Sequence, residues 1–161
     1  METRYTPHMS IPSVIYLGAD HAGFALKESV KRYLESAKFE VEDLGAHERD
    51  PDDDYPVYAA RVANVVRENP RAVGILFCRS AEGMCIAANK FDGIRAGIGF
   101  SMSAAESLRE DDQGNVLCLP GKIGTQDDPM AIVDTFLRTE PSKNSRHERR
   151  AKEIAQIEVI E

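Results

Sequence analysis

The run VGILFC at residues 73–78 decides how this chain is expected to fold. It is short and apolar, which predicts a buried strand ending at Cys78. A small-residue turn, RSAEG at 79–83, and a helix-compatible run, MCIAANK at 84–90, follow it. Open α/β sheets bind ligands at the carboxyl ends of their strands, and a helix N-terminus there favours anions and thiolates. Cys78 is therefore either a functional thiol or a buried structural cysteine, and its position alone leaves both open.

Strand-like and helix-like segments alternate on both sides of this run. Further strands are expected at residues 14–17, 94–98 and 115–119, with a less regular edge strand at 39–44. Helices are expected at 24–36, 56–66, 101–110, 130–138 and 146–161. This alternation predicts parallel βαβ units with right-handed crossovers, in a sheet covered on both faces. The expected fold class is a three-layer α/β domain on five parallel strands.

The chain length and composition suit one globular domain. Its 161 residues include 42% hydrophobic and 29% charged residues, which is ordinary for a protein with a full core. We expect a flexible leader at 1–13, the α/β domain at 14–140, and a linker with a C-terminal helix at 141–161. That helix has only a sparse apolar stripe, Ile154, Ile157 and Ile160. It is therefore expected to pack on a second subunit.

Several classes of protein are excluded by charge and patterning. The net charge of -7 argues against a nucleic-acid binder, and no apolar run approaches the ~20 residues that span a membrane. Three cysteines without close pairing do not indicate a disulfide framework, which predicts a reducing, cytoplasmic location. The cysteines and histidines are too scattered for a zinc site, so no metal centre is expected.

Polar residues gather where the odd-numbered strands end. The first strand runs into GADHAG at 18–23, where Asp20 could accept a sugar hydroxyl and His21 could donate to a phosphate. The alternatives are an aspartate that caps the next helix and a solvated histidine. The first, third and fifth strands of a parallel sheet end at the same rim. That rim is expected to carry Asp20, His21, Cys78, Ser80 and Lys122.

Charged residues elsewhere have a functional and a simpler interpretation. Asp111 and Asp112 precede the fifth strand, so they lie at the opposite rim and reach chemistry only by docking on another subunit. A solvated acidic turn is the alternative. Arg146 and Arg150 are four residues apart and share a helical face that suits a phosphate, or they belong to a solvated charged helix. The acidic run at 50–54 is expected to be a solvated loop.

Four motifs in order resemble one known family, the type B ribose-5-phosphate isomerases with the subunits of galactose-6-phosphate isomerase. The motifs are YLGADHAGF with Leu26 and Lys27 (16–27), DYP (54–56), IAANK with GIRA (86–96), and RHERR (146–150). The resemblance is collinear from residue 14 to about 155. It implies a Rossmann-like fold, a homodimer or dimer of dimers with sites at the subunit interface, and no metal or organic cofactor. The implied activity is aldose–ketose isomerisation of a sugar phosphate through an enediolate.

The same resemblance implies roles for individual residues. Cys78 matches the catalytic base, Ser80 matches the residue that supports it, and Asp111 occupies the position of a ring-opening histidine. The implied substrate-binding residues are Asp20, His21, Tyr55, Arg79, Ala81, Glu82, Gly83, Asp112, Lys122, Arg146 and Arg150. The two arginines are implied to come from the partner subunit.

This chain departs from the family pattern at two places. The family loop after the cysteine is Gly-Thr-Gly-x-Gly, whereas residues 79–83 are RSAEG here. The family segment Arg-Glu-His-Asn is REDD at 109–112. Two interpretations follow: an isomerase whose site is reshaped, for ribose 5-phosphate or another pentose or hexose phosphate, and a non-catalytic sugar-phosphate-binding paralogue or one subunit of a hetero-oligomeric isomerase.

Overall fold

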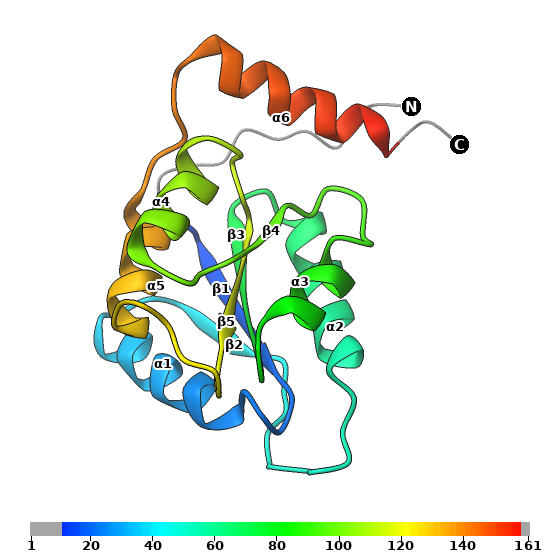
Figure 1. Ribbon diagram of the computed structural model, residues 1–161, viewed down its shortest axis with the longest axis vertical. Helices are drawn as coiled ribbons and strands as arrows, with labels where there is room; N and C mark the ends of the chain where they lie inside the picture. The colour runs from blue at the N-terminus through cyan, green and yellow to red at the C-terminus, as the bar shows by residue number, and fades with distance from the viewer. Residues whose placement is uncertain (1–10, 159–161) are drawn as a thin grey trace.

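The computed structural model describes residues 11–158 and shows a parallel sheet between layers of helices (Figure 1). The strands are β1 (Val14–Ala19), β2 (Val41–Asp43), β3 (Ala72–Cys78), β4 (Ala96–Ile98) and β5 (Val116–Pro120). The helices are α1 (Phe24–Ser36), α2 (Tyr55–Glu68), α3 (Glu82–Ala88), α4 (Met102–Glu110), α5 (Pro129–Arg138) and α6 (Ser145–Ile157). The expected three-layer α/β class with five parallel strands is confirmed.

The order of the strands is β2-β1-β3-β5-β4, and every neighbouring pair is parallel. The central strand β3 is buried along its whole length, as its uninterrupted apolar run predicts. The expected edge strand is found at β2, but it is shorter than the predicted 39–44. All five strands end at one rim of the sheet, so the loops that follow β1, β3 and β5 are neighbours.

Two apolar clusters cover the two faces of the sheet. One contains Leu34 of α1, Ala105 of α4 and Phe136 of α5, packed against alternate residues of β1, β3 and β5. The other contains Val62 of α2 and Met84 of α3, packed on the opposite face. Figure 1 shows the same division, with α1, α4 and α5 on one side and α2 and α3 on the other. The alternation of side chains along each strand therefore feeds two separate cores.

Short polar residues begin two helices where the sequence indicates. The Ser101 hydroxyl accepts a hydrogen bond from the Ala104 N–H at 3.1 Å, and α4 begins one residue later. Asp128 caps α5 in the same way, with its carboxylate 3.1 Å from the Ala131 N–H. Each cap satisfies an N–H group that the first helical turn leaves without an intrahelical partner.

The last helix, α6, lies across the amino-terminal end of the sheet, away from the rim where the strands end (Figure 1). Its Ala151 and Ala155 are buried, whereas Ile154 and Ile157 are exposed. These exposed isoleucines fit the expectation that α6 packs on a second subunit, which stays a prediction. Ile160 and residues 1–10 of the expected leader lie outside the described residues. Between residues 11 and 158, none of the helices has the length and apolar character needed to cross a membrane.

Candidate active site

The turn after β1 places two polar side chains at the rim. Asp20 is buried, and its Oδ1 accepts hydrogen bonds from the N–H groups of Ala22 (3.0 Å) and Gly23 (2.9 Å). A Cβ at Gly23 would lie 2.3 Å from the main chain of Phe77, so only glycine lets this turn lie against β3. Asp20 Oδ1 therefore holds the turn before α1. The interpretation of Asp20 as a helix cap is wrong, because α1 follows Gly23 and receives no side-chain cap.

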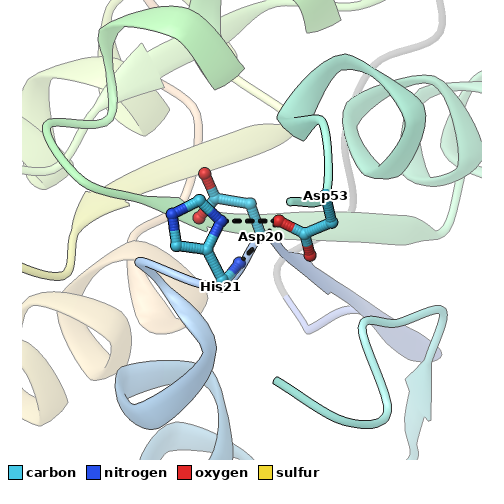
Figure 2. A group of neighbouring side chains, drawn as sticks. All are labelled: Asp20, His21 and Asp53. Carbon is cyan, nitrogen blue, oxygen red and sulfur yellow. Dashed lines mark hydrogen bonds and ion pairs between the residues drawn. The ribbon is translucent and has the colours of Figure 1, made fainter. Parts of the chain in front are cut away.

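His21 forms a close pair with Asp53, a residue from the acidic loop before α2. Asp53 Oδ1 accepts the His21 main-chain N–H at 3.0 Å and lies 2.7 Å from Nδ1 of the ring (Figure 2). The imidazole is 33% exposed and the carboxylate 6%. The expectation that residues 50–54 form a solvated loop is therefore wrong at Asp53, because the loop folds back over the turn after β1.

Hydrogen bonds keep the buried Asp53 charged. Burial by itself raises the pKa of this carboxyl group, but the bonds from the main chain and ring of His21, with the nearby Tyr58 hydroxyl, outweigh it. The net result is a pKa of Asp53 below the usual value. Burial, followed by the influence of Asp53, raises the pKa of Tyr58. Asp53 is thus an anion over the whole physiological range.

The donor atoms of Asp20, His21 and Asp53 all lie within 4.8 Å of one another, which is close enough to share a cation. His21 Nδ1 and Asp53 Oδ1 are already bonded to each other, and Asp20 Oδ1 already accepts two main-chain bonds. A metal ion would have to use the remaining atoms of the three side chains. The geometry is accounted for by the hydrogen bonds alone.

Cys78 lies at the centre of the same rim, at the end of β3. Its side chain is buried, and its carbonyl accepts the Gly121 N–H at 2.7 Å. The Lys122 N–H bonds the Arg79 carbonyl at 3.1 Å, and the Asp20 N–H lies 3.3 Å from the Phe77 carbonyl. These main-chain bonds tie together the segments that follow β1, β3 and β5, as the sequence predicts.

In the loop after Cys78, Ala81 has a left-handed backbone conformation that usually favours glycine. Ala81 precedes α3 with φ 72° and ψ -25°, the left-handed region that an alanine adopts only at a cost. A Cβ at Gly83 would lie 2.7 Å from the Tyr55 ring, so Tyr55 packs directly on this loop. Ser80 is half-buried, whereas Arg79 and Glu82 are exposed. The new charges therefore lie on the outside of the loop.

The remaining predicted residues lie at the other end of the molecule. Arg146 and Arg150 are exposed on α6, and Asp111 and Asp112 follow α4. Within one chain the structure does not bring these four residues to Cys78. The expectation that this group reaches the rim from a second copy stays a prediction.

Asp111 has a partner that the sequence did not reveal. Its Oδ1 lies 3.3 Å from Nδ1 of His147 on α6, and the side chains are 44% and 16% exposed respectively. Asp112 lines a hollow of about 330 Å³ with Arg95 and Ile154. His147 and Asp53 are thus the two polar residues that sequence reasoning missed. The only signal for either was its place inside a recognised motif or beside one.

Lys27, from the first motif, has a structural position. It is fully buried on α1, and its Nζ lies 2.5 Å from Asp43 Oδ2 and 2.9 Å from Glu28 Oε1. Burial by itself raises the pKa of Asp43. Hydrogen bonds from Lys27, the Gly45 N–H and Lys31 outweigh this effect, and the net pKa lies below the usual value. Lys27 therefore joins α1 to the end of β2 instead of facing a ligand.

Cys85 and Cys118 are free thiols on the same face of the sheet as Cys78. A hydrogen bond with Cys118 lowers the pKa of Cys85 to about 7 against the opposing effect of burial. Burial, with the neighbouring Cys85, raises the pKa of Cys118 well above its usual value. Cys85 is therefore the thiol that simple alkylating reagents are expected to modify near neutral pH.

The parallel sheet between two layers of helices, with a cysteine and an Asp–His turn at the ends of adjacent strands, defines an α/β protein of the class that binds ligands at the strand ends. The chain matches the family model described as ribose/galactose isomerase over residues 15–154. It is 39% identical to "Probable ribose-5-phosphate isomerase B" of Mycoplasma pneumoniae, over 93% of this chain and 98% of that protein. The chain belongs to the ribose/galactose isomerase family.

Solved structures agree with this assignment. Ribose-5-phosphate isomerase B from Mycoplasma genitalium, crystallised with bound ribulose-5-phosphate, superposes with a TM-score of 0.88 at 37% identity. That match covers 96% of this chain and 100% of that one. The enzyme from Thermotoga maritima gives a TM-score of 0.83 at 41% identity, over 89% of this chain and 98% of that one.

Proposed function

We propose that this chain interconverts ribose 5-phosphate and ribulose 5-phosphate. Family membership gives the class of reaction, the aldose–ketose isomerisation of a sugar phosphate. The observation that carries the choice of substrate is the rim that joins Cys78 to the Asp20–His21 turn. The structural relative that resembles this chain over 96% of its length binds ribulose-5-phosphate.

In this proposal Cys78 moves the proton. As a thiolate it removes the C2 proton of the open-chain aldose, and the electron pair of that bond forms an enediolate across C1 and C2. Transfer of the O2 hydroxyl proton to O1, with return of the abstracted proton to C1, leaves a carbonyl at C2 and a hydroxyl at C1, which is the ketose. Ser80 supports the thiol, and the main-chain N–H groups of the loop at 79–83 stabilise the oxyanion. The second carboxylate oxygen of Asp20 accepts a sugar hydroxyl.

The proposal divides the phosphate site between two copies of the chain. His21 and Lys122 belong to the rim of one copy, and Arg146 and Arg150 are supplied by α6 of the other. Two observations support this division: the arginines lie at the opposite end of the sheet, and α6 exposes Ile154 and Ile157. A two-fold dimer uses the same contact twice, so it would contain two complete sites.

Mixing two defective variants tests this arrangement directly. One carries Cys78→Ala and the other carries Arg146→Ala with Arg150→Ala, and each is inactive at low substrate concentration. In a hybrid dimer one site combines an intact Cys78 with intact arginines. Co-refolded equal mixtures are therefore expected to recover about a quarter of wild-type activity, because half of the dimers are hybrids with one good site. No recovery would show that each site is built from a single chain.

The altered residues around the reacting carbons favour testing other substrates beside ribose 5-phosphate. Arg79, Ala81, Asp111 and Asp112 all differ from the family pattern described above, and Glu82 adds a charge at the variable position of the loop. A panel of pentose and hexose phosphates, galactose 6-phosphate included, should show ribose 5-phosphate as the best substrate. No turnover of any member of the panel would favour the binding paralogue. We infer a cytoplasmic location from the three free thiols, which persist in a reducing compartment.

A further inference from the structure

We infer that Asp53 is a positioning residue, which holds the His21 ring with Nδ1–H toward its own carboxylate and Nε2 toward the sugar phosphate. This rests on the proposed function, since it names how one substrate-binding group of that site is oriented. Asp53 contacts no reacting atom in this account. Its effect on the reaction passes entirely through His21.

The geometry supports this role because one oxygen makes two bonds to the same residue. Asp53 Oδ1 accepts the main-chain N–H of His21 at 3.0 Å and bonds the ring nitrogen Nδ1 at 2.7 Å. The first contact fixes the turn, and the second fixes the rotation of the ring about its side-chain bonds. The side chain of Asp53 is 6% exposed, so few water molecules compete for its carboxylate.

The charge of Asp53 also decides which ring nitrogen carries the hydrogen. An ionised carboxylate only accepts hydrogen bonds, so Nδ1 must donate. In the neutral ring Nε2 is then an acceptor, suited to a sugar hydroxyl; in the protonated ring it is a donor, suited to a phosphate oxygen. Figure 2 shows Nε2 on the side of the ring that faces away from Asp53. Without Asp53, neutral His21 would populate both tautomers and more than one ring orientation.

Simple electrostatics predicts the opposite effect of removing Asp53. An aspartate beside a phosphate site repels the ligand, so deleting its charge should strengthen binding. Positioning predicts weaker binding, because the donor or acceptor that His21 presents is no longer held. The sign of the change therefore separates a positioning role from a general charge effect.

Asp52 provides a matched control one residue away. It is exposed, it carries the same charge, and its main-chain N–H bonds Asp50 at 3.0 Å without contacting His21. We expect Asp53→Ala to raise KM for ribose 5-phosphate on the order of tenfold, with a smaller change in kcat, because one charge-assisted hydrogen bond is lost. Asp52→Ala should leave KM unchanged or slightly lower. Equal effects of the two variants would overturn the inference.

Asp53→Asn adds a rescue test, because the amide oxygen can still accept from Nδ1 while the charge is gone. Its KM is expected to lie between those of wild type and Asp53→Ala. If Asp53→Ala does not fold, a KM of Asp53→Asn equal to wild type supports positioning by the acceptor. A KM of Asp53→Asn below that of wild type would support charge repulsion and overturn the inference.

A measurement without substrate keeps the inference separate from the proposed function. Nitrogen-15 spectra of the imidazoles, with His21 assigned from a His21→Gln variant, report which ring nitrogen carries the hydrogen in the neutral form. Wild type should show Nδ1–H at His21, and Asp53→Ala should lose that preference. An Nε2–H tautomer in the wild type would overturn the inference. Absent turnover of ribose 5-phosphate with the Nδ1–H tautomer in place would instead refute the proposed function.

Discussion

The two ends of the sheet each carry a histidine–aspartate pair, and the pairs are built in opposite ways. At the rim where the strands end, Asp53 is 6% exposed, lies 2.7 Å from the ring of His21, and also bonds the His21 main chain. At the amino-terminal end, the contact between His147 and Asp111 is 3.3 Å long, and the carboxylate is 44% exposed. In the first pair the histidine is the more exposed side chain and the aspartate is buried. In the second pair the aspartate is the more exposed side chain and the histidine is half-buried.

The two ends of the sheet also differ in how they are held together. The rim around Cys78 is held by main-chain bonds between the segments after β1, β3 and β5, so its geometry is complete within one chain. The opposite end carries exposed charges on α6 and on the turn after α4. Substitutions at the two ends should therefore affect different steps.

The largest effect is expected from Cys78→Ala at the rim. Removing a general base should lower kcat on the order of a thousandfold while leaving the binding of sugar phosphate nearly unchanged. Steady-state kinetics and isothermal titration would measure the two quantities separately. Cys85→Ala is the control and should keep activity, although a hydrogen bond with Cys118 lowers the pKa of Cys85 to about 7. Retained turnover in Cys78→Ala would remove this residue from the mechanism.

The second effect is at the opposite end, where Arg146→Ala and Arg150→Ala should act on binding. Each lost charge-assisted contact is expected to cost about 1.5–3 kcal/mol for phosphorylated ligands, and nothing for dephosphorylated sugars. Arg149→Ala is the control, because Arg149 lies on the same helix and pairs with Glu153 at 3.5 Å. Equal losses with both kinds of ligand would assign a structural role to Arg146 and Arg150.

A smaller effect is expected where the chain leaves its family. Asp111→His with Asp112→Asn breaks the contact with His147 and places two imidazoles side by side. We expect kcat/KM for the best substrate to fall about threefold to tenfold, roughly 0.7–1.4 kcal/mol. Glu106→Gln with Glu110→Gln removes the same charges from exposed positions on α4 and should change little. A rise in ribose 5-phosphate turnover would instead mark the two aspartates as losses from an ancestral site.

The last expected effect is on the stability of the rim and not on catalysis or binding. Ala81 is fully buried with a positive φ of 72°, whereas Ala63 is fully buried inside α2. Both lose a methyl group on replacement by glycine, but only Ala81→Gly relieves the left-handed backbone, worth about 1–2 kcal/mol. Chemical denaturation should show Ala81→Gly to be less destabilising than Ala63→Gly by roughly that amount. Equal free energies of unfolding would mean that Ala81 is not strained.

The sequence by itself determined the elements and the place of Cys78 at the end of the central strand. The apolar run at 73–78 predicts β3, the following small residues predict its end at Cys78, and the helix expected at 101–110 corresponds to α4. The parallel order of elements then predicts that Asp20, His21 and Lys122 share a rim with Cys78. These features follow from short-range backbone preferences and from the period of apolar residues, which a linear pattern contains.

Only the tertiary structure decided which charged side chains meet. Five aspartates lie near one another in the sequence, at 43, 50, 52, 53 and 54. Composition alone does not distinguish the aspartates of the run at 50–54 from one another. Asp53 alone is turned under His21, because the loop that carries it folds over a turn 32 residues earlier in the chain. His147 contacts Asp111 in a similar way, because the linker before α6 places this helix beside the turn that follows α4. Such pairs depend on how three separate elements pack, and no local pattern records that.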